Sequence, residues 1–150
     1  MTEPELAQEQ LETHIEAFDH VSVAVKDIET SQPLISLIGG QRIAGGESRR
    51  GGFAWAQFSL PGGGKLELIE PVDADPENFL RRFINTRGEG LHHLTFKVHK
   101  LDEAVAAARR LGFTITGFDD SHPAWKEAFV HPRSAHGVLI QLAEFPEDHG

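Results

Sequence analysis

The feature that most constrains this chain of 150 residues is an internal repeat. The segment HVSVAV at residues 20–25 aligns without a gap with HLTFKV at residues 93–98. The segment KLELIE at residues 65–70 aligns with LIQLAE at residues 139–144 after one further residue of shift, as a changed connecting loop would give. A repeat of this kind predicts that the chain folds as two copies of one supersecondary unit.

Hydrophobic periodicity predicts the elements of the first copy. The alternating residues 18–25 are typical of a strand, and a short helix is expected from Ser31 to the glycines that follow Ile38. Two more strands are predicted over residues 53–60 and 65–69, joined by the turn sequence PGGG. The polar stretch bracketed by Gly45-Gly46 and Gly51-Gly52 is predicted to be a loop.

The second copy shows the same order of elements. Strands are predicted over residues 91–98, 113–118, 128–131 and 138–143, and an alanine-rich helix over residues 101–111. We therefore expect an α+β fold in which tandem βαβββ modules form a curved mixed sheet around a metal-binding cavity. The expected parts are an N-terminal helical arm (1–17) and a single domain (18–150), with module one at 18–72, a connecting helix at 75–88 and module two at 90–146.

Charge and composition exclude several classes of function. The net charge is −9, and the basic pairs Arg49-Arg50 and Arg81-Arg82 are too small to offset it, so we expect no nucleic-acid partner. The apolar runs are too short for a membrane span. The chain has no cysteine, and its acidic N-terminus does not resemble a signal peptide, so a cytoplasmic location is expected.

Four polar residues coincide in the repeat, His20 with His93 and Glu67 with Gln141. Each lies in an otherwise apolar strand, on the face that a sheet curling around a cavity would turn inward. Two imidazoles, a carboxylate and an amide oxygen suit Co²⁺, Ni²⁺, Mn²⁺, Zn²⁺ or Fe²⁺ better than Ca²⁺. A lone strand histidine is more often packed or exposed than a ligand, but the agreement between the copies outweighs that default.

The pieces DHVSVAVKDIE, KLELIEP, RGEGLHHLTFKV and FVHPRSAHGVLIQL resemble the vicinal oxygen chelate superfamily, and within it the methylmalonyl-CoA epimerases, over residues 18–146. The resemblance implies a divalent metal cofactor with ligands at His20, Glu67, His93 and Gln141. It also implies an isomerase that stabilises an enolate of a small-molecule substrate, such as an acyl-CoA, after a base removes a proton beside a carbonyl. The repeat selects His93 as the ligand and leaves His92 as a flanking residue.

The candidate bases are Glu67 and Glu47. Gln141 stands where this family usually has Glu, and an amide cannot act as a general base, so Glu67 is the first candidate. In the epimerases an acid precedes the third strand, but the segment ESRRGG places Arg50 near that position. Glu47 is the nearest carboxylate and therefore the second candidate.

Two further segments differ from the family pattern and indicate a different substrate pocket. Pro33-Leu34 replaces an aromatic pair in the first short helix, and DDSHPAWKEAF replaces a glycine-rich loop. Trp125 in that segment has two interpretations, a ring that stacks on the substrate or, more commonly for an aromatic beside a strand, a core residue.

Three other functions fit the same resemblance. A glyoxalase-like lyase would use the carboxylate of Glu67, and an iron-dependent extradiol dioxygenase would use the triad of His20, His93 and Glu67. A metal-free binding protein of the bleomycin-resistance type would keep the fold without the chemistry, and the retention of four polar inward positions argues against it. Family members commonly pair, so a homodimer is expected.

Overall fold

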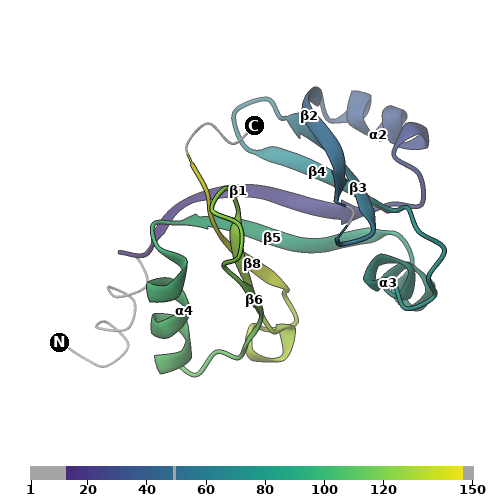
Figure 1. Cartoon of the computed structure of the whole chain (residues 1–150). Coiled ribbons are helices and arrows are strands. Elements are labelled where there is room, and N and C mark those ends of the chain that lie inside the picture. The colour runs from purple at the N-terminus through teal and green to yellow at the C-terminus, as the bar shows by residue number, and fades with distance from the viewer. Residues whose placement is uncertain (1–12, 49, 147–150) are drawn as a thin grey trace. The chain divides into compact units, whose positions relative to one another are not determined.

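The computed structural model describes residues 13–48 and 50–146. Its strands, shown in Figure 1, are β1 (Ile15–Ala24), β2 (Gln41–Ser48), β3 (Phe53–Ser59), β4 (Lys65–Pro71), β5 (Gly90–Val98), β6 (Ile115–Asp119), β7 (Lys126–Val130) and β8 (Ile140–Glu144). The helices are α2 (Gln32–Leu37), α3 (Phe79–Arg87) and α4 (Leu101–Arg110), with short 3-10 turns η1 (Glu29–Ser31) and η2 (Pro132–Ser134). Of the helices in this part of the chain, none has the length and apolar character needed to cross a membrane.

The strands form one mixed sheet in the order β2-β3-β4-β1-β5-β8-β7-β6. β1 is parallel to β4, and β5 is parallel to β8. Each of these parallel pairs continues into two antiparallel strands. Both halves of the chain therefore have the βαβββ order that the repeat predicts, and the expectation of an α+β fold with a mixed sheet is confirmed.

The chain divides into two compact units. We call residues 20–92 the N-terminal unit, and we call the described residues 13–19 and 93–146 together the C-terminal unit. β1 and β5 each contribute residues to both units, because each strand crosses a boundary between them.

In the N-terminal unit, helices cover both faces of the strands. On one face Ile35 of α2 packs with Phe58 and Leu68 in an apolar cluster. On the other face Leu80 of α3 packs with Ala24 and Ile69. Because strand residues alternate between faces, the second cluster lies on the face that also carries His20 and Glu67.

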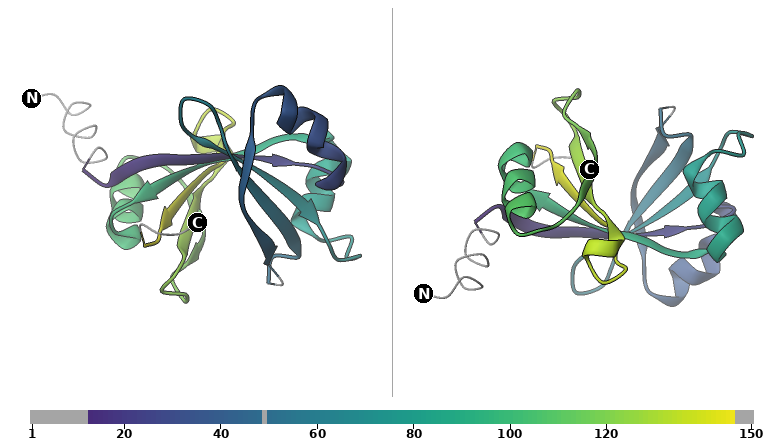
Figure 2. Two further views of the ribbon diagram at one scale, coloured as in Figure 1. Left: turned by 90° about the horizontal axis from the view of Figure 1, so that it is seen from above. Right: turned by 90° about the horizontal axis from the view of Figure 1, so that it is seen from below.

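In the C-terminal unit, α4 covers one face of the strands, and Figure 2 shows this helix from above and below. Leu101 and Val105 of α4 pack with Val98, Ala128 and Leu142. The core is therefore on one side of β5, β7 and β8, which leaves the alternate residues of these strands, including His93 and Gln141, for the other face.

The same acidic contact fixes the start of the helical segment in each unit. Glu70, in β4, accepts a hydrogen bond from the backbone N–H of Ile28 at 2.7 Å, just before η1. Glu144, at the end of β8, accepts one from the N–H of Leu101 at 2.7 Å, at the start of α4. A carboxylate satisfies an otherwise open N–H there and interacts favourably with the helix dipole.

The stretch predicted as a loop around Gly45-Gly46 is instead the edge strand β2. Gly46 lies opposite Trp55 of β3, and a side chain on Gly46 would come within 3.4 Å of the indole. The glycine therefore gives the Trp55 ring room over the neighbouring strand, a packing reason that turn propensity does not reveal.

Two predicted helical boundaries differ from the structure. Residues 1–12 of the predicted N-terminal arm lie outside the described residues, but Ile15–Ala17 belong to β1 and are not helical. The connecting helix predicted over 75–88 begins only at Phe79, because the Asn78 side chain accepts hydrogen bonds from the backbone N–H groups of Leu80 and Arg81 and caps it there.

Candidate functional site

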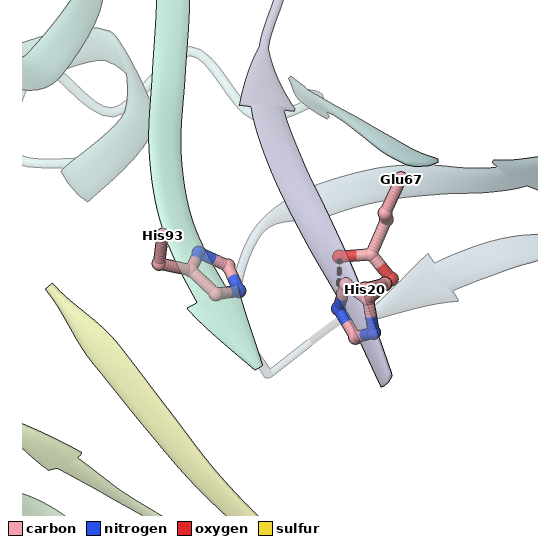
Figure 3. A group of neighbouring side chains, drawn as sticks. All are labelled: His20, Glu67 and His93. Carbon is pink, nitrogen blue, oxygen red and sulfur yellow. Dashed lines mark ion pairs between the residues drawn. The ribbon is translucent and has the colours of Figure 1, made fainter. Parts of the chain in front are cut away.

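The N-terminal unit holds a buried imidazole beside a carboxylate. His20 of β1 is 1% exposed, and its Nε2 lies 3.4 Å from Oε1 of Glu67 in β4, the ion pair drawn in Figure 3. The parallel pairing of β1 with β4 produces this contact, because it sets Ser22 opposite Glu67 and turns alternate residues of β1 to the same face.

Two further side chains hold the carboxylate of Glu67. The Ser22 hydroxyl donates to Oε1 at 2.8 Å, and the Gln57 amide of β3 donates to Oε2 at 2.9 Å. Burial raises the pKa of Glu67, but the neighbouring His20 and the hydrogen bonds from Gln57 and Ser22 together outweigh it, and the net pKa lies below its usual value. Glu67 is therefore an anion at neutral pH, held in one orientation.

His92, the residue beside the predicted ligand His93, packs among aromatic rings. Its ring centroid lies 5.6 Å from that of Phe79 and 4.8 Å from that of Phe83, both in α3. Burial, followed by the charge of Arg87, lowers the pKa of His92 to about 4, although Glu67 acts in the opposite direction. The imidazole is neutral at pH 7 and belongs to the packing between β5 and α3.

The C-terminal unit carries the counterpart of this arrangement with a different chemistry. Gln141 of β8 lies opposite Thr95 of β5, and the Thr95 hydroxyl donates to its Oε1 at 2.6 Å. Gln141 Nε2 in turn donates to Oε1 of Glu127 at 3.0 Å. His93, two residues before Thr95, contacts the ring of Phe129 at 6.2 Å between centroids and is the third residue labelled in Figure 3.

Glu47, the second predicted base, is not brought to the side of Glu67. It is exposed on the edge strand β2, opposite Ala54 of β3. Directly opposed residues of antiparallel strands point to the same face, and Ala54 alternates with Gln57, which bonds Glu67. The register therefore places Glu47 on the opposite face of the sheet. Arg50 is exposed in the turn after β2.

Sequence reasoning missed four side chains that hold the predicted ligands: Ser22, Gln57, Thr95 and Glu127. Ser22 and Thr95 could have been found, because the alignment that matches His20 with His93 also matches these two hydroxyl residues. Gln57 and Glu127 lie outside the aligned segments of the repeat, and their role follows only from strand pairing.

The structure supports in part the interpretation of Trp125 as a core residue. Its ring stacks on Phe145, with centroids 4.8 Å apart and planes at 15°. Its indole N–H also donates to Glu127 Oε1 at 2.7 Å, so the ring links the core of the C-terminal unit to the carboxylate beside Gln141.

Comparison with known proteins finds a matching family model and related chains. The family model described as Glyoxalase/Bleomycin resistance protein/Dioxygenase superfamily matches residues 19–129. The uncharacterized protein YqjC of Bacillus subtilis is 32% identical over 131 residues, which cover 84% of this chain and 90% of that protein. The mitochondrial methylmalonyl-CoA epimerase of Dictyostelium discoideum is 28% identical over 130 residues, which cover 84% of this chain and 76% of that protein.

A solved structure shows the same fold. The crystal structure of methylmalonyl-CoA epimerase from Mycobacterium tuberculosis superposes with a TM-score of 0.77 at 25% sequence identity, and the match covers 88% of this chain and 89% of that chain.

Proposed function

Because this chain belongs to the Glyoxalase/Bleomycin resistance protein/Dioxygenase superfamily, we propose that it is a metal-dependent epimerase that moves the proton on the carbon beside a carbonyl of an acyl-CoA. The observation that carries the proposal is the buried His20 beside a Glu67 carboxylate fixed by two donors. The epimerase relatives from Dictyostelium discoideum and Mycobacterium tuberculosis support the choice of reaction and substrate class.

The donor set fits a divalent ion. His20, Glu67 and His93 each offer one ligand atom, and we propose Gln141 Oε1 as the fourth. An imidazole, an anionic carboxylate and an amide oxygen are ligands that first-row divalent ions accept. When bound, the ion would act as a Lewis acid toward two adjacent substrate oxygens and offset the negative charge that forms as the proton leaves.

Glu67 is the proposed base. Its Oε1 is held by Ser22 and its Oε2 by Gln57, so the carboxylate keeps one orientation. Its lowered pKa keeps it unprotonated, and therefore able to accept a proton, at neutral pH. His20 lies beside this carboxylate and is almost fully buried. The electrostatic interaction between the imidazole and the carboxylate is therefore screened little by water.

The test is solvent exchange at the substrate carbon. Untagged protein loaded with Co²⁺ is incubated with methylmalonyl-CoA in deuterated buffer, and mass spectrometry follows deuterium at the α carbon against a protein-free control. We expect exchange faster than in the control, with conversion of one epimer to the other.

A protein that exchanges no α proton on methylmalonyl-CoA or on other branched acyl-CoAs would contradict the proposal. The same samples would then separate the rivals. Oxygen consumption with a catechol would indicate the dioxygenase, and turnover only of a thiol adduct would indicate the lyase. A cytoplasmic location and a homodimer stay predictions from the sequence.

A further inference from the structure

The C-terminal unit has a carboxylate that the sequence did not point to. Glu127 lies in β7, within the segment DDSHPAWKEAF that departs from the family pattern. Its Oε1 accepts two hydrogen bonds, one from Gln141 Nε2 at 3.0 Å and one from the indole of Trp125 at 2.7 Å. The carboxylate therefore connects the stacked Trp125 ring to the amide that we propose as a metal ligand.

These contacts lie on one face of the strands. Phe129 of β7 pairs directly with Gln141, and Glu127 is two residues from Phe129, so all three point to the same side. His93 contacts the Phe129 ring on that side, which is opposite the core beneath α4. The C-terminal unit thus presents an imidazole, an amide and a carboxylate together.

The chemistry of Glu127 determines which way the amide turns. An ionised carboxylate only accepts hydrogen bonds, so it must face the nitrogen of Gln141 and not the oxygen. The Thr95 hydroxyl does not decide the orientation by itself, because a hydroxyl can donate to the oxygen or accept from the nitrogen. With Glu127 in place, Thr95 donates and Oε1 lies on its side.

Trp125 fixes Glu127 in turn. The indole N–H is only a donor, so the atom of residue 127 that faces it must be an acceptor. Trp125 is held by its stacking on Phe145, which is 8% exposed. The packed ring of Trp125 therefore fixes the Glu127 carboxylate, and the carboxylate fixes the orientation of the Gln141 amide.

We infer that Glu127 is a positioning residue that orients the Gln141 amide so that its oxygen is presented as a metal ligand. This inference rests on the proposed function, because it takes Gln141 to be a ligand. A carboxylate has two oxygens and can bind a cation in either orientation. The Gln141 amide has only one oxygen, and in the flipped orientation it would present its NH₂ group to the cation, so its orientation has to be fixed.

The test is a cycle of variants with the Co²⁺ dissociation constant as the readout, measured by calorimetry on the full chain. Glu127→Leu removes the acceptor, and we expect it to weaken Co²⁺ binding about 10-fold or more, as loss of a residue that orients a ligand commonly does. Glu127→Gln removes the charge but keeps an oxygen that Trp125 holds in place, so we expect binding within about 3-fold of wild type.

The same substitution in a Gln141→Glu background separates orientation from other effects. A carboxylate at position 141 offers an oxygen whichever way it turns, so Glu127→Leu should cause no further loss there. Circular dichroism confirms that each variant is folded, and the Glu127→Gln variant keeps the test valid if Glu127→Leu does not fold.

The outcomes are distinct. Equal losses from Glu127→Leu in both backgrounds, or a loss in Glu127→Gln as large as in Glu127→Leu, would overturn the inference, because charge or structure would then explain the effect. A wild-type protein that binds Co²⁺ with no change in Glu127→Leu would overturn it as well. A wild-type protein that binds no Co²⁺ would instead show that the proposed function fails, and the inference with it.

Discussion

The two units share a backbone pattern and differ in the charge that it holds. In both, a last-strand residue lies opposite a hydroxyl on the first strand: Glu67 opposite Ser22, and Gln141 opposite Thr95. In the N-terminal unit Ser22 and Gln57 both donate to the Glu67 anion. In the C-terminal unit Thr95 donates to the neutral amide of Gln141, and the anion is Glu127, to which that amide donates. A repeat can therefore keep its register while the chemistry of its two copies diverges.

The parts that stayed alike are those that build the fold. Glu70 and Glu144 occupy matching positions, and each accepts a hydrogen bond at the start of the helical segment that follows the first strand of its unit. His20 and His93 occupy matching positions on their strands. His93 faces away from the core beneath α4, whereas His20 lies on the face where α3 packs. The side chains around the proposed ligands differ in charge: the N-terminal unit has the anion Glu67 where the C-terminal unit has the neutral Gln141.

The largest effect is expected from Glu67→Gln, which gives the N-terminal unit the same amide as the C-terminal unit. Proton exchange should fall by about 10²–10⁴-fold, because an amide cannot accept the proton, while most of the metal is kept. Deuterium exchange at the substrate carbon and metal content measure the two. Glu70→Gln, on the same strand, is the charge-matched control, and unchanged turnover in Glu67→Gln would rule out Glu67 as the base.

The second prediction concerns how the stability of the protein depends on pH through His92, a buried histidine of the N-terminal unit. His92 titrates near pH 4 in the folded protein and near 6.5 when unfolded, so the folded state binds fewer protons. The free energy of unfolding should therefore fall as the pH drops from about 6.5 to 4, by up to about 3 kcal/mol.

His92→Leu removes that titration, and its free energy of unfolding should be flatter over the same pH range. Urea unfolding of the metal-free protein at several pH values measures this, with His136→Leu, in an exposed turn, as the control. Identical pH slopes in wild type and His92→Leu would be inconsistent with a neutral, packed His92.

Gln141→Glu gives the C-terminal unit the carboxylate of the N-terminal unit. It replaces the donor to Glu127 with a second anion, so the metal-free protein should lose about 1–3 kcal/mol of stability at pH 7. Urea unfolding at pH 7 tests it, and adding Glu127→Gln should restore stability. A stable single variant at pH 7 would argue against the hydrogen bond.

The smallest effect compares the two hydroxyls. Ser22→Ala removes a donor to an anion and Thr95→Val removes a donor to a neutral amide, so Ser22→Ala should cost about 1 kcal/mol more at pH 7. A protonated Glu67 accepts a weaker hydrogen bond from Ser22. The difference in stability cost between the two variants should therefore vanish as the pH falls through the lowered Glu67 pKa. Equal costs at every pH would show that the two units are electrostatically alike.

The repeat made much of this predictable. Alternation around His20 and the alignment of the two copies predicted most of the strands and the polar positions His20, Glu67, His93 and Gln141, but not the pairing of Glu67 with Ser22. The error at Gly45-Gly46 arose because glycine reads as a turn signal unless the Trp55 ring above it is known. Glu127 was missed because its role depends on diagonal contact across β7 and β8, and sequence periodicity carries no information about that pairing.

The central claim is that this chain binds one metal ion, with His20 and His93 among its ligands. Elemental analysis of untagged protein, beside His20→Ala and His93→Ala, tests it most directly. We expect about one divalent ion per chain in the wild type and loss of the ion in both variants, since each removes an imidazole ligand. An ion retained in either variant, or no ion in the wild type after reconstitution, would contradict it.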